Sequence, residues 1–152
     1  MSNSNFSRFM KSNKKVKENT EYKATESLVD DNGEPLKWVI KPLTPKEHEN
    51  IREACSYDAK VPGKPNQVVS KIRQDEYMLK VMCKSIVYPN LHDKELQDSY
   101  GVMTPEELLQ AMIDDLGEYY NFSNFIMDFN GFNLYQKRLN KQKTNKWRGL
   151  GS

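Results

Sequence analysis

One stretch, Leu36–Glu47, strongly limits how this chain can fold, because it joins a strand directly to a helix. Its first half alternates between apolar and more polar residues, with Trp38 and Ile40 on the apolar side, which is the pattern of a half-buried strand. Pro42 ends this strand because it has no backbone N–H to donate. The Thr44–Glu47 segment then predicts a helix start, with Thr at the N-cap, Pro at the first helical position and Glu closing a capping box.

A β-hairpin is predicted for residues 21–41, because a type I′ turn at Asn32-Gly33 accommodates positive φ at both central residues. This turn places Val29 opposite Leu36, Ser27 opposite Trp38 and Thr25 opposite Ile40. Two strands alone are marginally stable. We therefore expect either that Trp38 packs on helices or that a further strand, from residues 61–70, completes a small sheet.

The remainder of the body is predicted to be helical. Helices are expected at residues 45–56, 71–88, 93–99 and 105–132, the last broken at Gly117 into a helical hairpin whose second helix Glu118 opens. Residues 57–70 contain two prolines and a glycine and are expected to be an irregular loop. The predicted fold class is α+β and mostly helical, with the N-terminal β-hairpin packed on a bundle of four to five helices.

Charge is distributed unevenly along the 152 residues. Residues 1–17 carry five basic side chains and no acidic one, and residues 137–148 carry six and no acidic one. The other twelve of the 23 basic residues and all 21 acidic ones lie between them, so the body has a charge of −9. We predict a flexible basic N-terminal arm (1–20), a single α+β domain (21–132) and a basic C-terminal tail (133–152).

Apolar and aromatic side chains at helical spacing dominate residues 105–132. Such a stripe belongs to a hydrophobic core more often than to a binding surface, but it is rich for a small domain, so a partner surface stays open. The candidate partner-binding residues are Leu109, Met112, Tyr119, Phe122, Phe125 and Phe129.

Motifs of catalysis and metal binding are missing from the sequence: there is no HExxH, CxxC, GxSxG or glycine-rich phosphate loop. Cys55 and Cys83 are expected to be buried small hydrophobes in a reducing cytoplasm. His48 and His92 are far apart in sequence and are expected to lie at the surface or at its rim. A non-enzymatic protein without cofactor or metal is predicted, although an active site assembled from distant residues stays open. No apolar run approaches the roughly 20 residues that span a bilayer, so we predict no membrane contact.

The basic C-terminal segment also contains Tyr135 and Trp147, and such a mixture can neutralise phosphates and stack bases. An acidic body would repel a nucleic acid, however. Direct nucleic-acid binding is therefore the alternative rather than the expected function, and a solvated tail or a peptide arm is favoured.

Several short motifs occur in an order that resembles a known family. They are Phe9-Met10-Lys11, Trp38-Val39-Ile40-Lys41-Pro42-Leu43-Thr44, Ser85-Ile86-Val87-Tyr88-Pro89, Leu108-Leu109 and Leu116-Gly117-Glu118-Tyr119. Together they resemble the XkdN-like family of phage tail assembly chaperones, over roughly residues 6–132.

The resemblance implies a non-enzymatic assembly factor of phages and prophages. Such a factor would bind the helical, hydrophobic tape measure protein in the cytoplasm of the bacterial host, and would be absent from the mature virion. Self-association, or association with a frameshift-extended form of itself, is also implied. The family brings no catalytic residues. The alternatives are a nucleic-acid-binding accessory protein and a minor structural protein of the virion, such as a connector.

Overall fold

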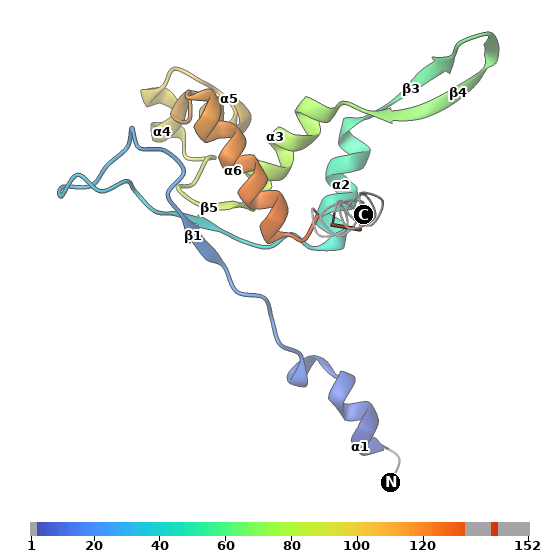
Figure 1. The fold of residues 1–152 in the computed structure, drawn as a ribbon, viewed down its shortest axis with the longest axis horizontal. Coiled ribbons are helices and arrows are strands. Elements are labelled where there is room, and N and C mark those ends of the chain that lie inside the picture. The colour runs from blue at the N-terminus through green and yellow to red at the C-terminus, as the bar shows by residue number, and fades with distance from the viewer. Residues whose placement is uncertain (1–2, 133–140, 143–152) are drawn as a thin grey trace, which may run out of the picture.

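The protein is described by a computed structural model over residues 3–132 and 141–142. It has the α+β fold class that the sequence predicts, and helices dominate it (Figure 1). Its elements are α1 (Asn3–Phe6), β1 (Thr20–Tyr22), β2 (Trp38–Ile40), α2 (Pro45–Cys55), β3 (Ser56–Val61), β4 (Lys64–Ile72), α3 (Gln74–Ser85), β5 (Ile86–Tyr88), α4 (Lys94–Ser99), α5 (Pro105–Met112) and α6 (Leu116–Phe129).

The predicted antiparallel pairing of two N-terminal strands is present, as β1 and β2, and a third strand extends it into a sheet of order β1-β2-β5. Tyr22, not Ser27, lies opposite Trp38. The first strand is therefore five residues closer to the N-terminus than the register predicted from the turn at Asn32-Gly33. The third strand is β5, which follows α3 directly and pairs Ile86 with Ile40. The predicted helix 71–88 therefore ends at Ser85, and the predicted third strand from residues 61–70 belongs to another sheet.

The turn between β1 and β2 also differs from the prediction. Gly33 has a φ of +80°, but among the described residues only glycines have a positive φ, so Asn32 does not have one. A type I′ turn needs positive φ at both central residues and is therefore excluded. Asp30 organises the turn instead: its Oδ1 accepts hydrogen bonds from the backbone N–H groups of Asn32 (2.8 Å) and Glu34 (3.0 Å). An Asp side chain can stabilise a turn in this way without a left-handed neighbour. The nearest bridge pairs Val29 with Pro35 rather than with Leu36.

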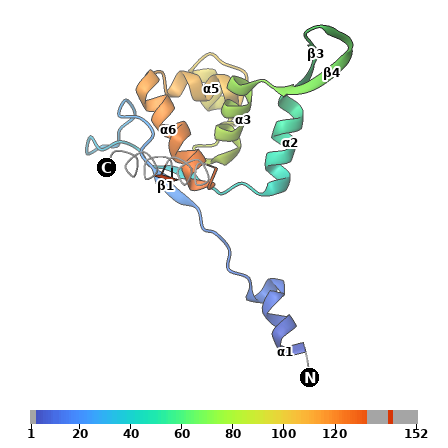
Figure 2. The same cartoon turned by 45° about the vertical axis from the view of Figure 1, so that its right-hand side comes forward.

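Residues 56–72, predicted to be largely an irregular loop, form a two-stranded antiparallel ribbon that projects from the body (Figure 1 and Figure 2). The Pro62-Gly63 turn lies between the paired residues Val61 and Lys64, and Gly63 has a φ of +76°. Pro followed by a glycine of positive φ is typical of a type II turn. Pro62 therefore shapes the tip of the ribbon, and Pro65 lies within β4 without ending it.

Two helices begin with the Thr-Pro device that the sequence predicts. At α2 the capping box is complete, because Thr44 Oγ1 accepts from the N–H of Glu47 (3.2 Å) and the Glu47 carboxylate accepts from the N–H of Thr44 (3.1 Å). At α5, Thr104 caps the helix in the same way, but Glu107 accepts from Met103 instead.

The second helix of the predicted helical hairpin starts earlier than expected. Asp115 is its N-cap and accepts from the N–H of Glu118 (2.9 Å), so Gly117 lies inside the first turn of α6 rather than at a break. The chain turns instead at residues 113–115. An aspartate N-cap satisfies the free N–H groups of a first turn, which explains why the helix begins there.

The hydrophobic core lies where β2 meets α3, α5 and α6. Its largest fully buried side chains include Trp38, Ile40, Met82, Leu108 and Phe122. Trp38 contacts Phe122 edge-on, with 5.6 Å between ring centroids. Trp38 thus packs on the helices, which was one of the two arrangements expected from the sequence.

The N-terminal arm extends away from the body in both views (Figure 1 and Figure 2). It contains α1 and short 3₁₀ turns at Ser7–Phe9 and Lys11–Asn13. Its flexibility, like the domain boundaries, stays a prediction. The basic tail predicted for residues 133–152 lies outside the described residues, apart from the exposed pair 141–142.

Candidate functional site

The aromatic face of α6 is covered largely by the first strand. Tyr22 stacks on Phe125 with ring centroids 4.2 Å apart and on Phe122 at 5.1 Å. Burial, and to a smaller degree the charge of Glu118, raises the pKa of the Tyr22 hydroxyl. The aromatic surplus of this helix therefore stabilises the contact between strand and helix.

The six predicted partner-binding residues fall into two groups. Leu109, Met112 and Phe122 are buried in the core, with exposed fractions of 0%, 6% and 0%. The other three, Tyr119, Phe125 and Phe129, are half-buried and pack against the core from its edge. The structure does not gather all six on one accessible surface, and a partner in contact with the folded chain meets the second group.

Contacts at the two ends of α6 hold the arm and the β1–β2 connection on this helix. Lys17 donates a hydrogen bond to the carbonyl of Phe129, and its Nζ lies 4.2 Å from the centroid of the Phe129 ring. A cation is favourable at this end of a helix, where carbonyl groups lack partners. At the other end, the Glu118 carboxylate accepts from Thr25 Oγ1 (2.7 Å) and from the N–H of Glu26 (2.8 Å).

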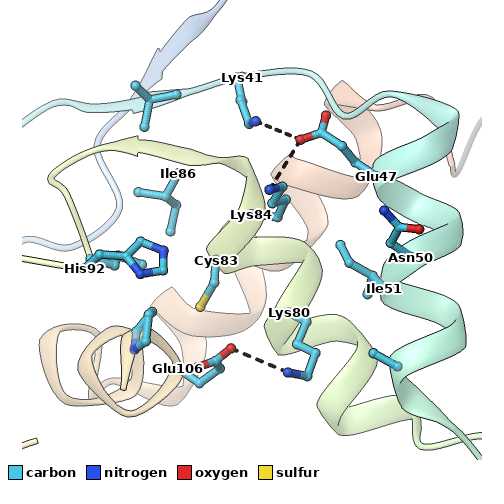
Figure 3. Close-up of a pocket in the computed structure, with 14 residues that line it drawn as sticks. Lys41, Glu47, Asn50, Ile51, Lys80, Cys83, Lys84, Ile86, His92 and Glu106 are labelled. Atoms are coloured by element: carbon cyan, nitrogen blue, oxygen red, sulfur yellow. Dashed lines mark hydrogen bonds and ion pairs between the residues drawn. The ribbon is translucent and has the colours of Figure 1, made fainter. Parts of the chain in front are cut away.

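A groove lies between α2 and α3, closed at its ends by β5 and the start of α5 (Figure 3). We call it the α2–α3 groove; its volume is about 640 Å³. Apolar and small side chains line it: Ile51, Ala54, Cys83, Ile86, Val87, Leu91 and Pro105. Charged or polar side chains share the lining: Lys41, Glu47, Asn50, Lys80, Lys84, His92 and Glu106.

Glu47 links three elements at one end of this groove. Its carboxylate accepts from Lys41 Nζ at 2.9 Å and lies 3.7 Å from Lys84 Nζ (Figure 3). The same carboxylate closes the cap on Thr44. The hydrogen bond from Lys41 lowers the pKa of Glu47 from 4.5 to about 2, against an opposing effect of burial. At the other end, Lys80 pairs with Glu106 at 3.7 Å. Each lysine of the groove is thus within ion-pair distance of a glutamate.

Burial shifts the pKa of two groups in this region, Cys83 and His48. Burial raises the pKa of the Cys83 thiol to about 12, so this cysteine is a poor nucleophile. His48 lies outside the groove, where its Nε2 and the hydroxyl of Tyr77 are 2.5 Å apart. Burial lowers the His48 pKa, with Arg52 acting in the same direction.

A second hollow, of about 470 Å³, lies between the start of α3, α5 and the start of α6. Apolar and aromatic groups are contributed by Met78, Ile113, Leu116, Tyr119 and Tyr120, and polar ones by Asp75, Gln110, Asp114 and Asp115. Three of these side chains are carboxylates and none is basic. We call this hollow the acidic groove. Among the predicted partner residues it contains Tyr119, whose hydroxyl pKa is raised mainly by burial.

Two further observations concern cofactors and membranes. Within residues 3–132 and 141–142, no group of three or more His, Cys, Asp or Glu side chains is arranged to hold a metal ion. In the same part of the chain, no helix has both the length and the apolar character that crossing a bilayer requires.

Sequence reasoning missed both grooves, because each is built from segments that are distant in the chain. It also missed Tyr22 as the cover of α6, although the correct strand register would have placed Tyr22 beside Trp38. The sequence does carry one usable signal for the α2–α3 groove. Glu47 closes a capping box and lies six residues after Lys41, so the sequence places these two opposite charges near the start of α2, although no site was predicted there.

Two proteins of Bacillus subtilis and one solved structure are similar to this chain. Protein XkdN of the phage-like element PBSX of Bacillus subtilis (strain 168) is 24% identical over 105 residues, which are 69% of this chain and 70% of XkdN. Protein YqbN of the same organism is 24% identical over 115 residues, 76% of each chain. The crystal structure of YqbN matches with a TM-score of 0.67 at 21% identity, covering 82% of this chain and 94% of that one, and so has the same fold.

The family comparison agrees with these relatives and with the motifs of the sequence. The model of the phage XkdN-like tail assembly chaperone proteins matches residues 6–143, which is most of the chain and includes every element from β1 to α6. This chain therefore belongs to the XkdN-like family of phage tail assembly chaperones.

Proposed function

We propose that this chaperone binds helical segments of the tape measure protein in the host cytoplasm and keeps that protein soluble until the tail tube forms around it. It acts without catalysis, is absent from the finished virion, and associates with further copies of itself, including any frameshift-extended copy. The observation that carries the proposal is the α2–α3 groove, because its lining combines apolar side chains with charges of both signs.

The shape and chemistry of the groove suit a helix. An amphipathic helix that binds in a groove inserts apolar anchors and keeps its polar face outward. Ala54 and Val87 offer exposed apolar surface at the groove, and Val87 is 45% exposed. Below them, Ile51 and Leu91 are almost completely buried and form an apolar floor. A long helical and hydrophobic client would supply many such anchors, each bound weakly.

The charges around the groove disfavour a nucleic acid as its ligand. A phosphate backbone binds through lysines and arginines whose counterions it can release. Here Lys41 and Lys84 lie beside Glu47, and Lys80 lies beside Glu106. We therefore propose a protein client, whose mixed charges these ion pairs accommodate.

Three of the predicted partner-binding residues, Tyr119, Phe125 and Phe129, remain as proposed contacts with a partner protein. They are half-buried, so they add the edges of their rings to a surface rather than forming a pocket of their own. We place the main client contact in the α2–α3 groove and assign Tyr119 to the acidic groove.

The test is co-expression with the tape measure protein encoded by the same phage. The wild-type chain should keep that client soluble and co-purify with it. Val87→Asp, which adds a charge to the groove, should reduce the co-purified client about tenfold or more. Val29→Asp is the matched control, because Val29 is similarly exposed at 47% but lies in the β1–β2 connection, outside the groove.

Three outcomes would count against the proposal. An insoluble client with the wild-type chain would contradict the function itself. Equal client recovery with Val87→Asp and wild type would contradict the groove as its site. Detection of the chain by mass spectrometry in purified virions, at the level of a structural protein, would favour a virion component instead.

A further inference from the structure

The acidic groove has an electrostatic character opposite to that of the N-terminal arm. Asp75, Asp114 and Asp115 contribute three carboxylates, and no side chain that lines the groove is basic. Its apolar part is open to solvent, since Leu116 is 70% and Tyr120 58% exposed. Exposed apolar groups beside carboxylates that have no basic side chain in the same lining are typical of a surface that binds a positively charged, partly apolar partner.

The arm carries the complementary features. Phe6, Phe9 and Met10 are 66%, 85% and 51% exposed. Phe6 and Phe9 are three residues apart in consecutive helical turns, so both can face one partner. Residues 1–17 contain five basic side chains and no acidic one. Large apolar side chains rarely remain this exposed in a row unless another surface covers them.

We propose that the arm of one copy docks in the acidic groove of a second copy, with the aromatic side chains of the arm against Leu116, Tyr119 and Tyr120 and its basic residues beside the three aspartates. This inference rests on the self-association that the proposed function includes, and it names the residues that would mediate it. It does not depend on which client the chaperone binds.

The placement of the arm favours a second copy over the groove of the same chain. Lys17 is anchored at the C-terminal end of α6, on Phe129, whereas the acidic groove lies at the N-terminal end of that helix. With a rise of about 1.5 Å per residue, these ends are roughly 20 Å apart, so the arm would have to turn back along α6 to reach the groove of its own chain. The segment that carries α1 instead leads away from the body in both views (Figure 1 and Figure 2), which favours a groove on another molecule.

Arm and groove are different surfaces, so the contact is heterologous: each copy inserts its own arm into one neighbour and receives the arm of another neighbour in its groove. Copies joined in this way form a ring if the rotation closes and an open chain if it does not. The charged part of the contact should weaken as salt shortens the Debye length from about 10 Å at 0.1 M to about 3 Å at 1 M.

Complementation between two variants tests the proposal on the purified full-length chain, without any client. The arm variant is Phe9→Ser with Met10→Ser, and the groove variant is Leu116→Lys. Val16→Ser is the control for the arm, at 81% exposure, and Met103→Lys is the control for the groove, at 87% exposure. Circular dichroism melting verifies that each variant is folded, and sedimentation velocity over a range of concentrations gives the mass.

The wild type and both controls should gain mass with concentration. Each test variant alone should associate at least about tenfold more weakly, whereas their mixture should form a species of two chains, because one intact arm then meets one intact groove. A wild type that stays monomeric up to its solubility limit, a test variant that associates like the wild type, or a mixture that remains monomeric would each overturn the proposal. Self-association without client binding would leave it standing while contradicting the proposed client.

Discussion

The hydroxyl of Thr25 donates a hydrogen bond of 2.7 Å to the carboxylate of Glu118, which lies 93 residues further along the chain. Thr25 is 2% exposed, so the donor side of this part-buried bond is shielded from water. The same carboxylate also accepts from the backbone N–H of Glu26 at 2.8 Å. One side chain in the first turn of α6 thus anchors the long connection between β1 and β2.

Glu118→Ala should lower the free energy of unfolding by about 1–3 kcal/mol, because Thr25 and the N–H of Glu26 lose an ionised acceptor. Glu118→Gln keeps an acceptor oxygen and should cost less. Urea denaturation measures both variants. Glu49→Ala, on the exposed side of α2, is the control and should stay within about 0.5 kcal/mol of wild type. Equal stability of the Glu118→Ala and Glu49→Ala variants would contradict the anchoring role.

Phe122→Ala should destabilise the fold strongly, by about 3–5 kcal/mol, since it leaves a cavity between two aromatic neighbours. Phe122 is fully buried, stacks on Tyr22 and meets Trp38 edge-on. Tyr120→Ala on the same helix removes a ring that is 58% exposed and should have a far smaller effect on stability. Thermal and denaturant unfolding should rank the two variants in this order; the reverse order would show that the core is centred elsewhere.

The two threonine caps provide a matched pair. Thr44→Ala and Thr104→Ala should each lower the free energy of unfolding by about 1 kcal/mol, because a first-turn N–H loses its acceptor. Thr44→Ala should cost more, since Thr44 Oγ1 also contacts the Glu47 carboxylate at 3.2 Å. Serine at either position keeps the capping oxygen and should recover most of the loss. Failure of serine to recover stability would point to the methyl group rather than to the cap.

Glu47 makes the stability of the fold depend on pH in the acidic range. Its pKa is lowered to about 2 in the folded chain, from a usual 4.5, first of all by the hydrogen bond from Lys41. A lowered pKa means that the folded state binds the proton less readily than the unfolded state does. The stabilisation is therefore fully present above about pH 4.5 and is lost as the pH falls from there towards 2. Because Lys41 is 34% exposed, solvent screening keeps the contribution modest.

Glu47→Gln should consequently flatten the decline in stability between pH 4.5 and 2. Urea midpoints at several pH values within this window give the slope, and Glu49→Gln on the same helix is the control. The Glu47→Gln and control slopes should differ, with the control following wild type. Identical slopes for all three proteins would place the acid sensitivity in other carboxylates.

Local signals in the sequence predicted the local features of the fold. The Thr-Pro starts of α2 and α5 and the helical stripes of α3, α5 and α6 depend on neighbouring residues, and the structure has each of these helices, with shifted ends. The β1–β2 register failed because it was derived from one turn type. Asp30 accepts two backbone hydrogen bonds in that turn, which favours a different turn type. The position of β1 therefore does not follow from the turn.

The candidate site was predicted less well, because accessibility depends on what covers a residue. The stripe that includes Phe122 and Phe125 has the same periodicity whether it faces a partner or Tyr22. Only the packing of a distant strand decides between them. The same limit applies to both grooves, since no periodicity within a single helix indicates the space between α2 and α3.

The β3–β4 ribbon meets the body at a narrow base. The N–H of Arg73 donates to the carbonyl of Cys55 at 2.9 Å. This hydrogen bond joins the end of α2 directly to the start of α3, in addition to the covalent connection through the ribbon. The Arg73 guanidinium lies 4.7 Å from the centroid of the Tyr57 ring at this base. The distance between the two helices is therefore independent of the ribbon's length. The tip at Pro62-Gly63 is accordingly a permissive place to lengthen, shorten or label the chain, where an inserted epitope or fluorophore leaves both helices in position.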